Sequence, residues 1–565
     1  MTTFHGDLSI GDIFNLTIYR PWEFDATSPI RSVVPLYLMY GLPLALLRLS
    51  AKVGAITTVT GYMVLIVSRL AVVIASFGVD LCVYRMSAAA RLSSRYGSAL
   101  LVASSYVTLV YYSRTFSNTL EAFLFALLLY QTMQYSDKLS DQDKTKHTMS
   151  ESGCKDLCPD DKPFQRSDSF AVALTIVTGV FNRPTFVFYA LIPYLCWLQT
   201  DQIFGQFSEM TAVLRRAVKS GVSVMFISLL FIFGDSLYHG RMSLERGALI
   251  GDLREKGILE FVTTNLTVTP YNFAAYNLQP KNLAEHGVHL RITHVAVNVQ
   301  LLFGFLGAFA VVDVGHAIVR RSFPKHPSST ALLASYTVPL LLLSVFPHQE
   351  PRFLIPLLIP LTIVYSSRLC GPDSCRVWRW AWIVFNVLGC VFFGIFHQGG
   401  VVSAIASFQP DIIISRSVTE VNFWHTYMPP RHLFMISSAD DNVQPSIVVN
   451  DLAGSTIDKL FLSLEASRQY REEQATDVFL VVPGSLHYHL ICALQSHPVF
   501  TLELWHVFSP HFSGEDPPDL GIVTGRSLDF KDCHSYIDDL RAKSVMRRLF
   551  DSMSLNVYKV ASSLD

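Results

Sequence analysis

Charged residues are scarce in this sequence. Aspartate, glutamate, lysine and arginine make up 16% of its 565 residues, whereas hydrophobic residues make up 50% and aromatic residues 12%. An ordinary soluble chain carries about 25% charged residues, so this composition excludes a single water-soluble globular protein. Most of the sequence is therefore predicted to lie in a lipid bilayer.

The sequence also lacks an excess of either charge. It has 44 basic and 45 acidic residues and a formal net charge of -1, which provides no overall basic field for nucleic acid. Its nine cysteines are scattered, and the two close pairs, Cys154/Cys158 and Cys370/Cys375, have no histidine pair to complete a zinc site. We therefore expect neither a nucleic-acid partner nor a bound metal.

The N-terminus lacks a signal peptide of the usual form, because residues 1–12 are polar and contain no apolar core. Membrane targeting is therefore assigned to an internal span. About ten apolar stretches are candidates to cross the roughly 30 Å of hydrocarbon in a bilayer. They are residues 62–84, 97–112, 120–135, 169–181, 185–198, 221–237, 295–312, 332–346, 354–365 and 380–396.

Basic residues in the short loops orient these spans. If each stretch crosses once, five groups of basic residues fall on one side, at 85–95, 136–168, 215–219, 320–325 and 368–379. That side is predicted to be the cytoplasm. The opposite side, a lumen, receives residues 113–119, 181–184, 239–294, 347–353 and everything after residue 397. The glycosylation sequons at Asn15 and Asn265 fall in stretches placed on the luminal side, which agrees with this orientation.

The membrane part is predicted to have two regions. Residues 1–61 form a luminal N-terminal loop, and within it residues 33–49, interrupted by prolines and a glycine, form a juxtamembrane or re-entrant helix. Residues 62–406 form the multi-spanning domain. Within that domain, residues 136–168 are charged and low in aliphatic side chains and are predicted to be a disordered cytoplasmic loop, whereas residues 239–294 form a luminal loop.

Residues 407–565 are predicted to form a C-terminal luminal domain of mixed α/β structure. The β-branched run at 447–449 and the apolar run at 477–482 indicate strands. Residues 455–473 and 536–552 have helical patterns. A chain of this kind is a polytopic α-helical membrane protein with one soluble domain at its end.

Ionisable and polar side chains cluster at the luminal ends of the predicted spans. Charged groups are costly at membrane depth and persist there mainly for function or for tight pairing. The residues concerned are Arg114, Asn182, Arg183, Asp235, His348, Glu350 and Arg352. For Arg114, Arg183 and Asp235, a buried ion pair that fixes helix packing is an equal alternative to ligand contact. The four polar groups in residues 348–352, between two apolar spans, favour function.

These residues resemble the motifs of a known family. His348-Gln349-Glu350-Pro351-Arg352-Phe353 resembles the His-x-Glu-x-Arg-Phe signature of the dolichyl-phosphate-mannose-dependent mannosyltransferases of glycosyltransferase family 22, and residues 114–118, 181–185 and 234–236 are similar to its other blocks. The resemblance implies a GT-C architecture in the endoplasmic reticulum membrane, with a luminal active site. It also implies inverting transfer of mannose from the lipid-phosphate donor, with no cofactor or metal.

Three further stretches resemble one group within that family. Residues 20–24, 269–278 and 424–431 are similar to the enzymes that add the fourth mannose to the glycosylphosphatidylinositol (GPI) precursor. This implies an α-1,2 linkage to the third mannose of a GPI glycolipid, with membrane lipid as the other partner and no protein partner indicated. The third-mannose GPI enzymes and the N-glycan mannosyltransferases of the same family remain alternatives. A transporter, or a catalytically inactive relative, is the alternative from another class.

A lipid-phosphate sugar donor sets chemical requirements for the polar cluster. It needs a forked cation for the phosphate, a carboxylate to take the proton of the acceptor hydroxyl, and apolar walls for the isoprenoid. Arg352 fits the first role, with His348 and Arg183 as helpers. Glu350 and Asp235 are expected to hold sugar hydroxyls or to orient the arginines. With Asn182 and Arg114 they make up the predicted donor- and acceptor-binding residues.

The catalytic base is unassigned. Members of the family begin with a first span and a luminal His-Pro-Asp-Glu-type motif whose carboxylate is the expected base, and this sequence begins just downstream of where both should be. Near the start only Asp7 and Asp12 are acidic. Asp7 is the remaining candidate and a poor substitute, which predicts a truncated or inactive form unless another residue supplies the base.

Overall fold

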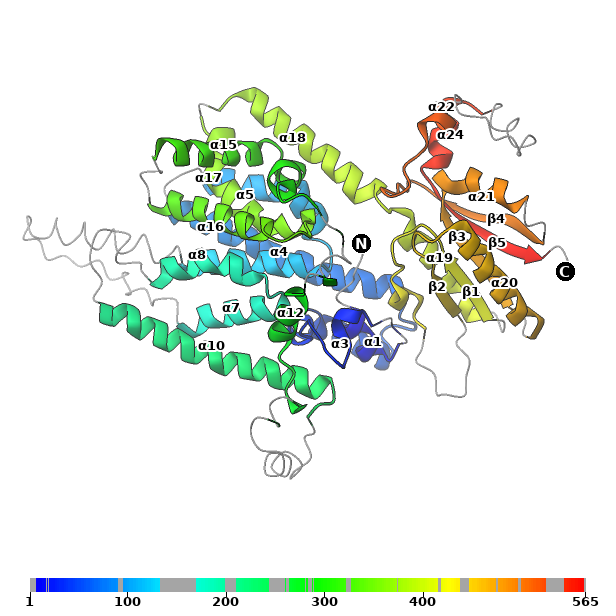
Figure 1. Ribbon diagram of the computed structural model, residues 1–565, viewed down its shortest axis with the longest axis horizontal. Coiled ribbons are helices and arrows are strands. Elements are labelled where there is room, and N and C mark those ends of the chain that lie inside the picture. Colours follow the sequence, from blue (N-terminus) through cyan, green and yellow to red (C-terminus); the bar gives the residue numbers. More distant parts are fainter. Residues whose placement is uncertain are drawn as a thin grey trace, which may run out of the picture. The chain divides into compact units, whose positions relative to one another are not determined.

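The computed structural model divides the chain into two compact units (Figure 1). The sheet unit consists of Met1–Tyr19, Pro43–Ser68 and Leu388–Asp565, and the helical unit of Arg20–Leu42 and Arg69–Val387. The residues that the structure describes are 7–16, 18, 20–89, 95–132, 169–198, 210–242, 260, 264–279, 281–282, 287, 289–321, 327–372, 374–414, 418–436, 447–473, 476–495, 499–524 and 543–562. The predicted loop at 136–168 lies outside them.

Long apolar sequences form the helices of the helical unit. Large hydrophobic side chains such as Ile74, Leu229 and Val387 remain exposed on the outer faces of these helices, as lipid contact requires. The elements are η1 (Trp22–Phe24), α2 (Val34–Leu36), η2 (Tyr37–Gly41), α4 (Gly61–Ala89), α5 (Arg95–Ser104), η3 (Val107–Tyr111), a helix at 117–132, α7 (Ser169–Asn182), α8 (Phe186–Leu198), α10 (Met210–Tyr238), α12 (Thr269–Asn277), η4 (His294–Asn298), α14 (Val299–Phe303), α15 (Phe305–Arg320), α16 (Pro327–Ser344), η5 (Pro351–Leu357), α17 (Leu358–Cys370) and α18 (Arg376–Val391). Two of them, α4 and α18, continue into the sheet unit.

Within the part of the chain that the structure describes, most residues of each predicted apolar stretch are helical. Among the described residues, five helices are long and apolar enough to cross a membrane. They are Val34–Lys52, Gly61–Ser87, Val213–Tyr238, Pro351–Cys370 and Arg376–Phe396. Shorter apolar helices cover Ser169–Asn182, Phe186–Leu198, His294–Phe303 and Ser328–Ser344. The prediction of a polytopic helical membrane protein agrees with this set.

The segment predicted as a juxtamembrane or re-entrant helix forms a helix at Val34–Lys52. Pro35 lies in the first turn of α2, where its missing N–H removes no intrahelical bond. The π-helical turn η2 precedes Pro43 and lets the chain continue into α3 (Leu42–Lys52). The length of this helix suits a span as well as a juxtamembrane position, so the predicted placement stays a prediction.

A five-stranded mixed sheet organises the sheet unit. Its strand order is β2-β1-β3-β5-β4, with β1 parallel to β2 and β3, and β5 antiparallel to β3 and β4. The strands are β1 (Val418–Phe423), β2 (Ile447–Asp451), β3 (Thr476–Pro483), β4 (Phe500–Phe508) and β5 (Leu555–Ser562). The other elements are α1 (Asp7–Phe14), α3, η6 (Phe392–Phe396), α19 (Gly400–Ile414), η7 (Arg431–Phe434), α20 (Ile457–Glu473), η8 (Gly484–Leu486), α21 (His487–Leu494), α22 (Leu520–Thr524) and α24 (Val545–Ser552).

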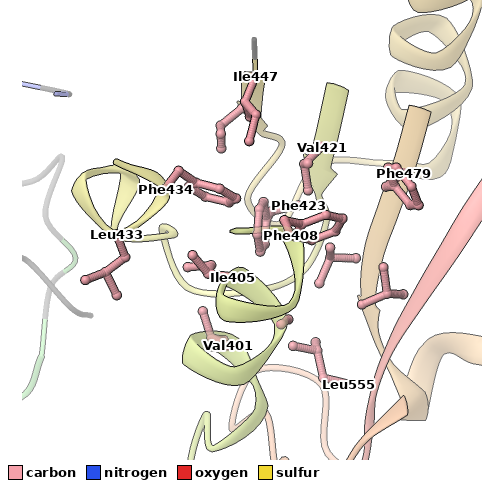
Figure 2. Packing of buried hydrophobic residues seen from close by; sticks show 14 of the residues in the cluster. Val401, Ile405, Phe408, Val421, Phe423, Leu433, Phe434, Ile447, Phe479 and Leu555 are labelled. Carbon is pink, nitrogen blue, oxygen red and sulfur yellow. The ribbon is translucent and has the colours of Figure 1, made fainter. Parts of the chain in front are cut away.

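Hydrophobic cores lie on both faces of this sheet. On one face, Phe408 of α19 packs with Phe423, Phe434 and Phe479 (Figure 2). On the other, side chains of α20 and α21 pack with Val478, Leu480, Val482 and Tyr558. Because successive strand residues point to opposite faces, a strand buried on both sides needs an unbroken apolar run. This is why residues 478–482 are all apolar.

The predicted α/β elements of the C-terminal region are largely present. The strands predicted at 447–449 and 477–482 are β2 and β3, and the helix predicted at 455–473 is α20. Of the helix predicted at 536–552, the described part is α24. In the sheet unit these elements belong to the stretch Leu388–Asp565, which Met1–Tyr19 and Pro43–Ser68 join; the predicted domain boundary at 407 stays a prediction. The β1, β4 and β5 strands were not predicted.

A close contact between α7 and α8 depends on Gly179. A Cβ atom at this position would lie 2.2 Å from the ring of Phe186, which is fully buried. The carbonyl of Gly179 also accepts a hydrogen bond of 2.8 Å from the backbone N–H of Arg183. Gly179 therefore sets the geometry of the turn that carries Asn182 and Arg183.

We expect Gly179→Ala to destabilise the helical unit by about 1–3 kcal/mol, because Phe186 must leave its packed position. The loss is measured as a lower Tm in detergent micelles. The control is Gly78→Ala in α4, where nothing lies within 4 Å of the added methyl group. Because alanine favours a helix over glycine, the control is expected to be neutral or slightly stabilising. Equal Tm values for the two variants would contradict the close-contact argument.

Candidate functional site

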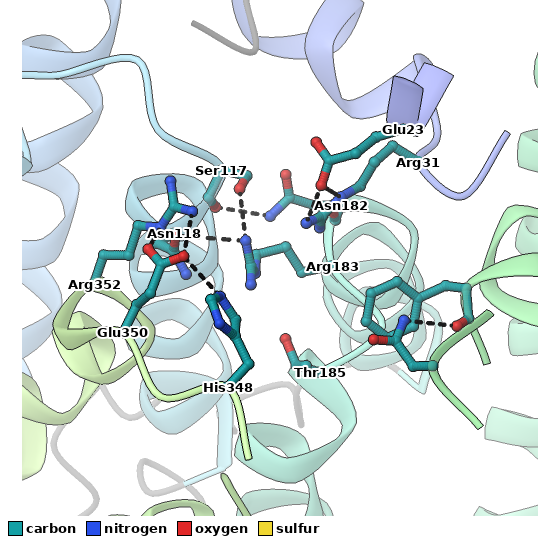
Figure 3. A network of polar contacts seen from close by, with 12 residues as sticks. Glu23, Arg31, Ser117, Asn118, Asn182, Arg183, Thr185, His348, Glu350 and Arg352 are labelled. Carbon is teal, nitrogen blue, oxygen red and sulfur yellow. Dashed lines mark hydrogen bonds and ion pairs between the residues drawn. The ribbon is translucent and has the colours of Figure 1, made fainter. Parts of the chain in front are cut away.

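Arg183 lies at the centre of a buried polar cluster in the helical unit (Figure 3). It follows α7 in the turn to α8. One guanidinium nitrogen donates to the hydroxyl of Ser117 at 3.1 Å and to the side-chain oxygen of Asn118 at 3.5 Å. A second, Nε, lies 3.6 Å from the carboxylate of Glu121. Two of the predicted blocks, at 114–118 and 181–185, therefore meet at this side chain.

Glu121 is the buried counter-charge of Arg183. Its carboxylate accepts hydrogen bonds from Asn118 at 3.1 Å and from Thr185 at 3.2 Å. The sequence analysis did not select this residue, because it lies inside the apolar stretch at 120–135. A lone carboxylate within a predicted span is itself a signal of tight pairing or function, and it could have identified Glu121.

Phe353 connects Arg183 to the His348–Phe353 motif. The guanidinium carbon of Arg183 lies 5.0 Å from the centre of the Phe353 ring, and that of Arg352 lies 5.9 Å from it. The hydroxyl of Tyr189 donates to the carbonyl of Phe353. One aromatic ring is thus shared by two cations, a favourable arrangement for guanidinium groups in apolar surroundings.

Glu350 orients both of the other ionisable groups of the motif. His348 Nε2 lies 2.8 Å from Oε1 of Glu350, and Arg352 contacts both carboxylate oxygens of Glu350, at 2.5 and 2.9 Å. Burial acts to raise the pKa of Glu350, but the hydrogen bond from His348 and the charge of Arg352 outweigh it and lower this pKa to about 2. The carboxylate is therefore ionised at neutral pH. Its contacts match the predicted role of orienting an arginine.

Gln349 holds the backbone of the motif. Its side-chain oxygen accepts from the N–H of His294 at 2.8 Å, and its amide nitrogen donates to the carbonyls of Ser344 and Phe346 at 3.0 and 3.1 Å. The carbonyl of Gln349 accepts from Asn298 at 3.2 Å. Gln349 belongs to the predicted motif, but the sequence analysis assigned it no role, because the partners of its side chain are backbone atoms that no side-chain pattern reveals.

Arg31 borders the cluster on the side of Asn182. Asn182 donates to the carbonyl of Ser117 at 2.9 Å, and Arg31 donates to the carbonyl of Asn182 at 3.4 Å. Arg31 also forms an ion pair of 3.1 Å with Glu23. Asn182 therefore acts here through backbone contacts, and Arg31 and Glu23 are additional charged residues of the cluster.

Asp235 holds the segment that carries Arg31. Its fully buried carboxylate accepts from the hydroxyl of Ser32 at 2.9 Å, the N–H of Val33 at 3.0 Å and the hydroxyl of Thr269 at 3.2 Å. These bonds join α10 to α2 and α12. The contacts match the scaffolding alternative for Asp235, and its predicted contact with sugar hydroxyls stays a prediction.

The remaining predicted residues occupy other positions. Arg114 lies with its guanidinium carbon 6.0 Å from the centre of the Tyr111 ring. Asp7 begins α1 of the sheet unit, next to η7. Asn15 follows α1 with a positive φ of 58°, and the Thr17 of its sequon lies outside the described residues. Asn265 is only 7% exposed, which disfavours a glycan there.

The arginines of this cluster, Arg31, Arg183 and Arg352, each pair with a glutamate. A guanidinium has five N–H donors, so each can still bind an anionic ligand after such pairing. Among the described residues, no group of three or more His, Cys, Asp or Glu side chains is placed to hold a metal ion. The arrangement suits binding of a phosphate group beside apolar walls.

Comparison with known proteins identifies a family for the chain. Residues 9–436 match the Alg9-like mannosyltransferase family. The chain is 32% identical to GPI alpha-1,2-mannosyltransferase 4 of Homo sapiens, over 93% of this chain and 86% of that protein. It is 32% identical to GPI mannosyltransferase 4 of Aspergillus oryzae, over 84% and 81%, and 27% identical to that of Drosophila melanogaster, over 95% and 85%. No solved structure matches the chain.

Glu350 is expected to make the stability of the helical unit depend on pH. Its folded pKa of about 2 lies below the ordinary value of 4.5, so its contribution is complete above pH 4.5 and is lost as the pH falls towards 2. The difference corresponds to about 3 kcal/mol. We expect Glu350→Gln to lower the Tm at neutral pH and to remove this part of the acid-induced loss. Parallel curves of Tm against pH for both proteins would contradict the assignment.

Proposed function

The chain belongs to the Alg9-like mannosyltransferase family, and on that basis we propose that it transfers mannose from dolichyl-phosphate mannose to the third mannose of a GPI precursor, forming an α-1,2 linkage with inversion. The observation that carries the proposal is the cluster around Arg183, in which the His348–Phe353 motif meets the blocks at 114–118 and 181–185. The GPI acceptor is supported by the names of the relatives, two of which are 32% identical to this chain.

Arg352 is the proposed phosphate ligand. Its side chain is 21% exposed, whereas that of Arg183 is 7% exposed, so Arg352 is the more accessible of the two. Glu350 fixes its planar fork in one orientation, which reduces the entropy lost on binding an anion. In this proposal Arg183 supports Phe353 and adds positive potential beside the phosphate.

The proposed reaction is a single displacement. The oxygen of the acceptor hydroxyl forms a bond to the anomeric carbon of the donor mannose, and the bond from that carbon to the phosphate oxygen breaks. The phosphate leaves with the electron pair, stabilised by the arginines, so no acid is needed to protonate it. The hydroxyl proton passes to a general base, which stays unassigned.

We also propose that the active site and the sheet unit face the lumen of the endoplasmic reticulum. The distribution of arginine and lysine among the loops supports this orientation. A second support comes from the sheet unit, where Cys492 is disulfide-bonded. Disulfides persist in oxidising compartments such as this lumen and are rare in the cytosol.

The proposal is tested by expressing the chain in cells that lack the fourth-mannose step and analysing their GPI precursors by mass spectrometry. We expect four-mannose lipids with the wild-type chain. Arg352→Ala is expected to lower transfer by at least about 100-fold, because a charge-stabilising contact to the leaving phosphate is lost.

The matched control is Arg368→Ala. Arg368 also pairs with a carboxylate, that of Asp313 at 2.7 Å, and also lies over aromatic rings, those of Phe309 and Tyr365. It is not part of the cluster around Arg183, so its variant is expected to transfer normally. Absence of four-mannose lipids with the wild-type chain would contradict the proposed acceptor, and normal transfer by Arg352→Ala would remove Arg352 from the site.

A further inference from the structure

Two aromatic side chains form an exposed pair beside the polar cluster. Trp22 is 45% exposed although it is a large hydrophobic residue, and its ring centre lies 4.9 Å from that of the half-buried Tyr276. Trp22 belongs to the 3₁₀ turn η1, which is anchored by the buried Phe24. Tyr276 lies near the end of α12. The two segments, far apart in the sequence, together present an aromatic surface.

A series of contacts connects this aromatic pair to the site. Arg31 lies 5.8 Å from the Phe273 ring of α12 and pairs with Glu23, the residue next to Trp22. Asn272 of α12 donates to the carbonyl of Pro29 at 2.9 Å. The backbone N–H of Ile30 donates to the carbonyl of Glu23 at 2.9 Å, which closes the loop. Arg31 also donates a hydrogen bond to the carbonyl of Asn182, which precedes Arg183 in the turn between α7 and α8. These contacts therefore link the aromatic pair to that turn.

We infer that Trp22 and Tyr276 form a binding surface for the mannose chain of the acceptor glycolipid. The inference rests on the proposed function and names the subsite that holds the acceptor. Aromatic rings provide flat apolar area that matches the C–H face of a sugar ring, and nearby polar groups bind its hydroxyls. Here the neighbouring polar group is the carboxylate of Glu23, whose side chain is 17% exposed.

The acceptor, rather than the donor, fits this surface. The donor carries one sugar directly on its phosphate, so a donor held by Arg352 keeps that sugar close to Arg352. The acceptor has several sugars, and those beyond the reacting mannose must extend away from the centre. In the view of Figure 3, Glu23 and Arg31 lie on one side of Arg183, and Arg352 and Glu350 lie on the other. Trp22 is the sequence neighbour of Glu23 and is therefore connected to the Glu23–Arg31 pair rather than to the proposed phosphate ligand.

A membrane-interface role is the competing explanation, because tryptophan and tyrosine are enriched where membranes meet water. The ion pair between Glu23 and Arg31 directly beside Trp22 favours a polar ligand, since charged groups are unfavourable against acyl chains. A lipid contact would affect only substrates that carry a lipid. A glycan contact would affect a lipid-free glycan as well, and this difference separates the two explanations.

The test compares wild-type chain with Trp22→Ala and Tyr276→Ala in a micellar transfer assay, using the three-mannose GPI precursor and, separately, its lipid-free glycan. We expect each variant to raise the KM for both acceptors by about tenfold, the loss of one aromatic packing contact. The kcat and the KM for dolichyl-phosphate mannose should stay within about twofold of the wild-type values, since the donor and the reacting groups do not contact this surface. Trp22→Phe, which keeps a ring, is expected to recover most of the loss.

Tyr271→Ala is the matched control. Tyr271 is also an exposed aromatic residue of α12, at 71% exposure, but five residues before Tyr276 it lies on another face of the helix. The Tyr271→Ala variant is expected to transfer mannose with an unchanged KM for both acceptors. An unchanged acceptor KM in Trp22→Ala, or a raised KM for the glycolipid alone, would overturn the inference while leaving the proposed function intact. A wild-type chain without transfer would overturn both.

Discussion

The ion pair between Arg183 and Glu121 is the constraint on which the polar cluster depends. Both side chains are buried, at 7% and 1% exposure, and charges at that depth are stable only when they are paired and hydrogen-bonded. Ser117, Asn118 and Thr185 supply those bonds. The pair therefore ties the helix at 117–132 to the turn between α7 and α8. Removing either charge would leave the other buried and uncompensated, at a cost of about 3–5 kcal/mol.

The same pairing extends across the site. Arg31 and Arg352 have their own glutamates, Glu23 and Glu350, so carboxylates partly compensate the positive charges that these guanidinium groups bring close together. Each stays oriented by its partner before a ligand arrives. Preorganised donors of this kind stabilise developing negative charge better than water does, because they need no reorientation during the reaction. The pairing thus gives both structural stability and the electrostatics that a phosphate leaving group requires.

A second group of buried contacts supports the charged centre from outside. Asp235 joins α10, α2 and α12 through its three hydrogen bonds, and Gln349 fixes the backbone before Glu350. Neither contacts Arg183 in the described hydrogen bonds. Together with Gly179 they position the loops that carry the reactive groups. The residues at the mouths of the helices therefore fall into two sets, one that presents charge and one that holds the loops.

The amino-acid sequence alone determined the helices and the chemical types of the site residues. Apolar runs and the motif at 348–353 are local features, and so is the unbroken apolar run of β3, which is why they could be predicted. Only the tertiary structure decided which of these residues meet. Ser32 and Asp235 are 203 residues apart and Thr185 and Glu121 are 64 apart, so no local pattern reveals their contacts. Glu121 and Arg31 were missed, and Gln349 was given no role, because a buried side chain obtains its role from partners that folding brings to it.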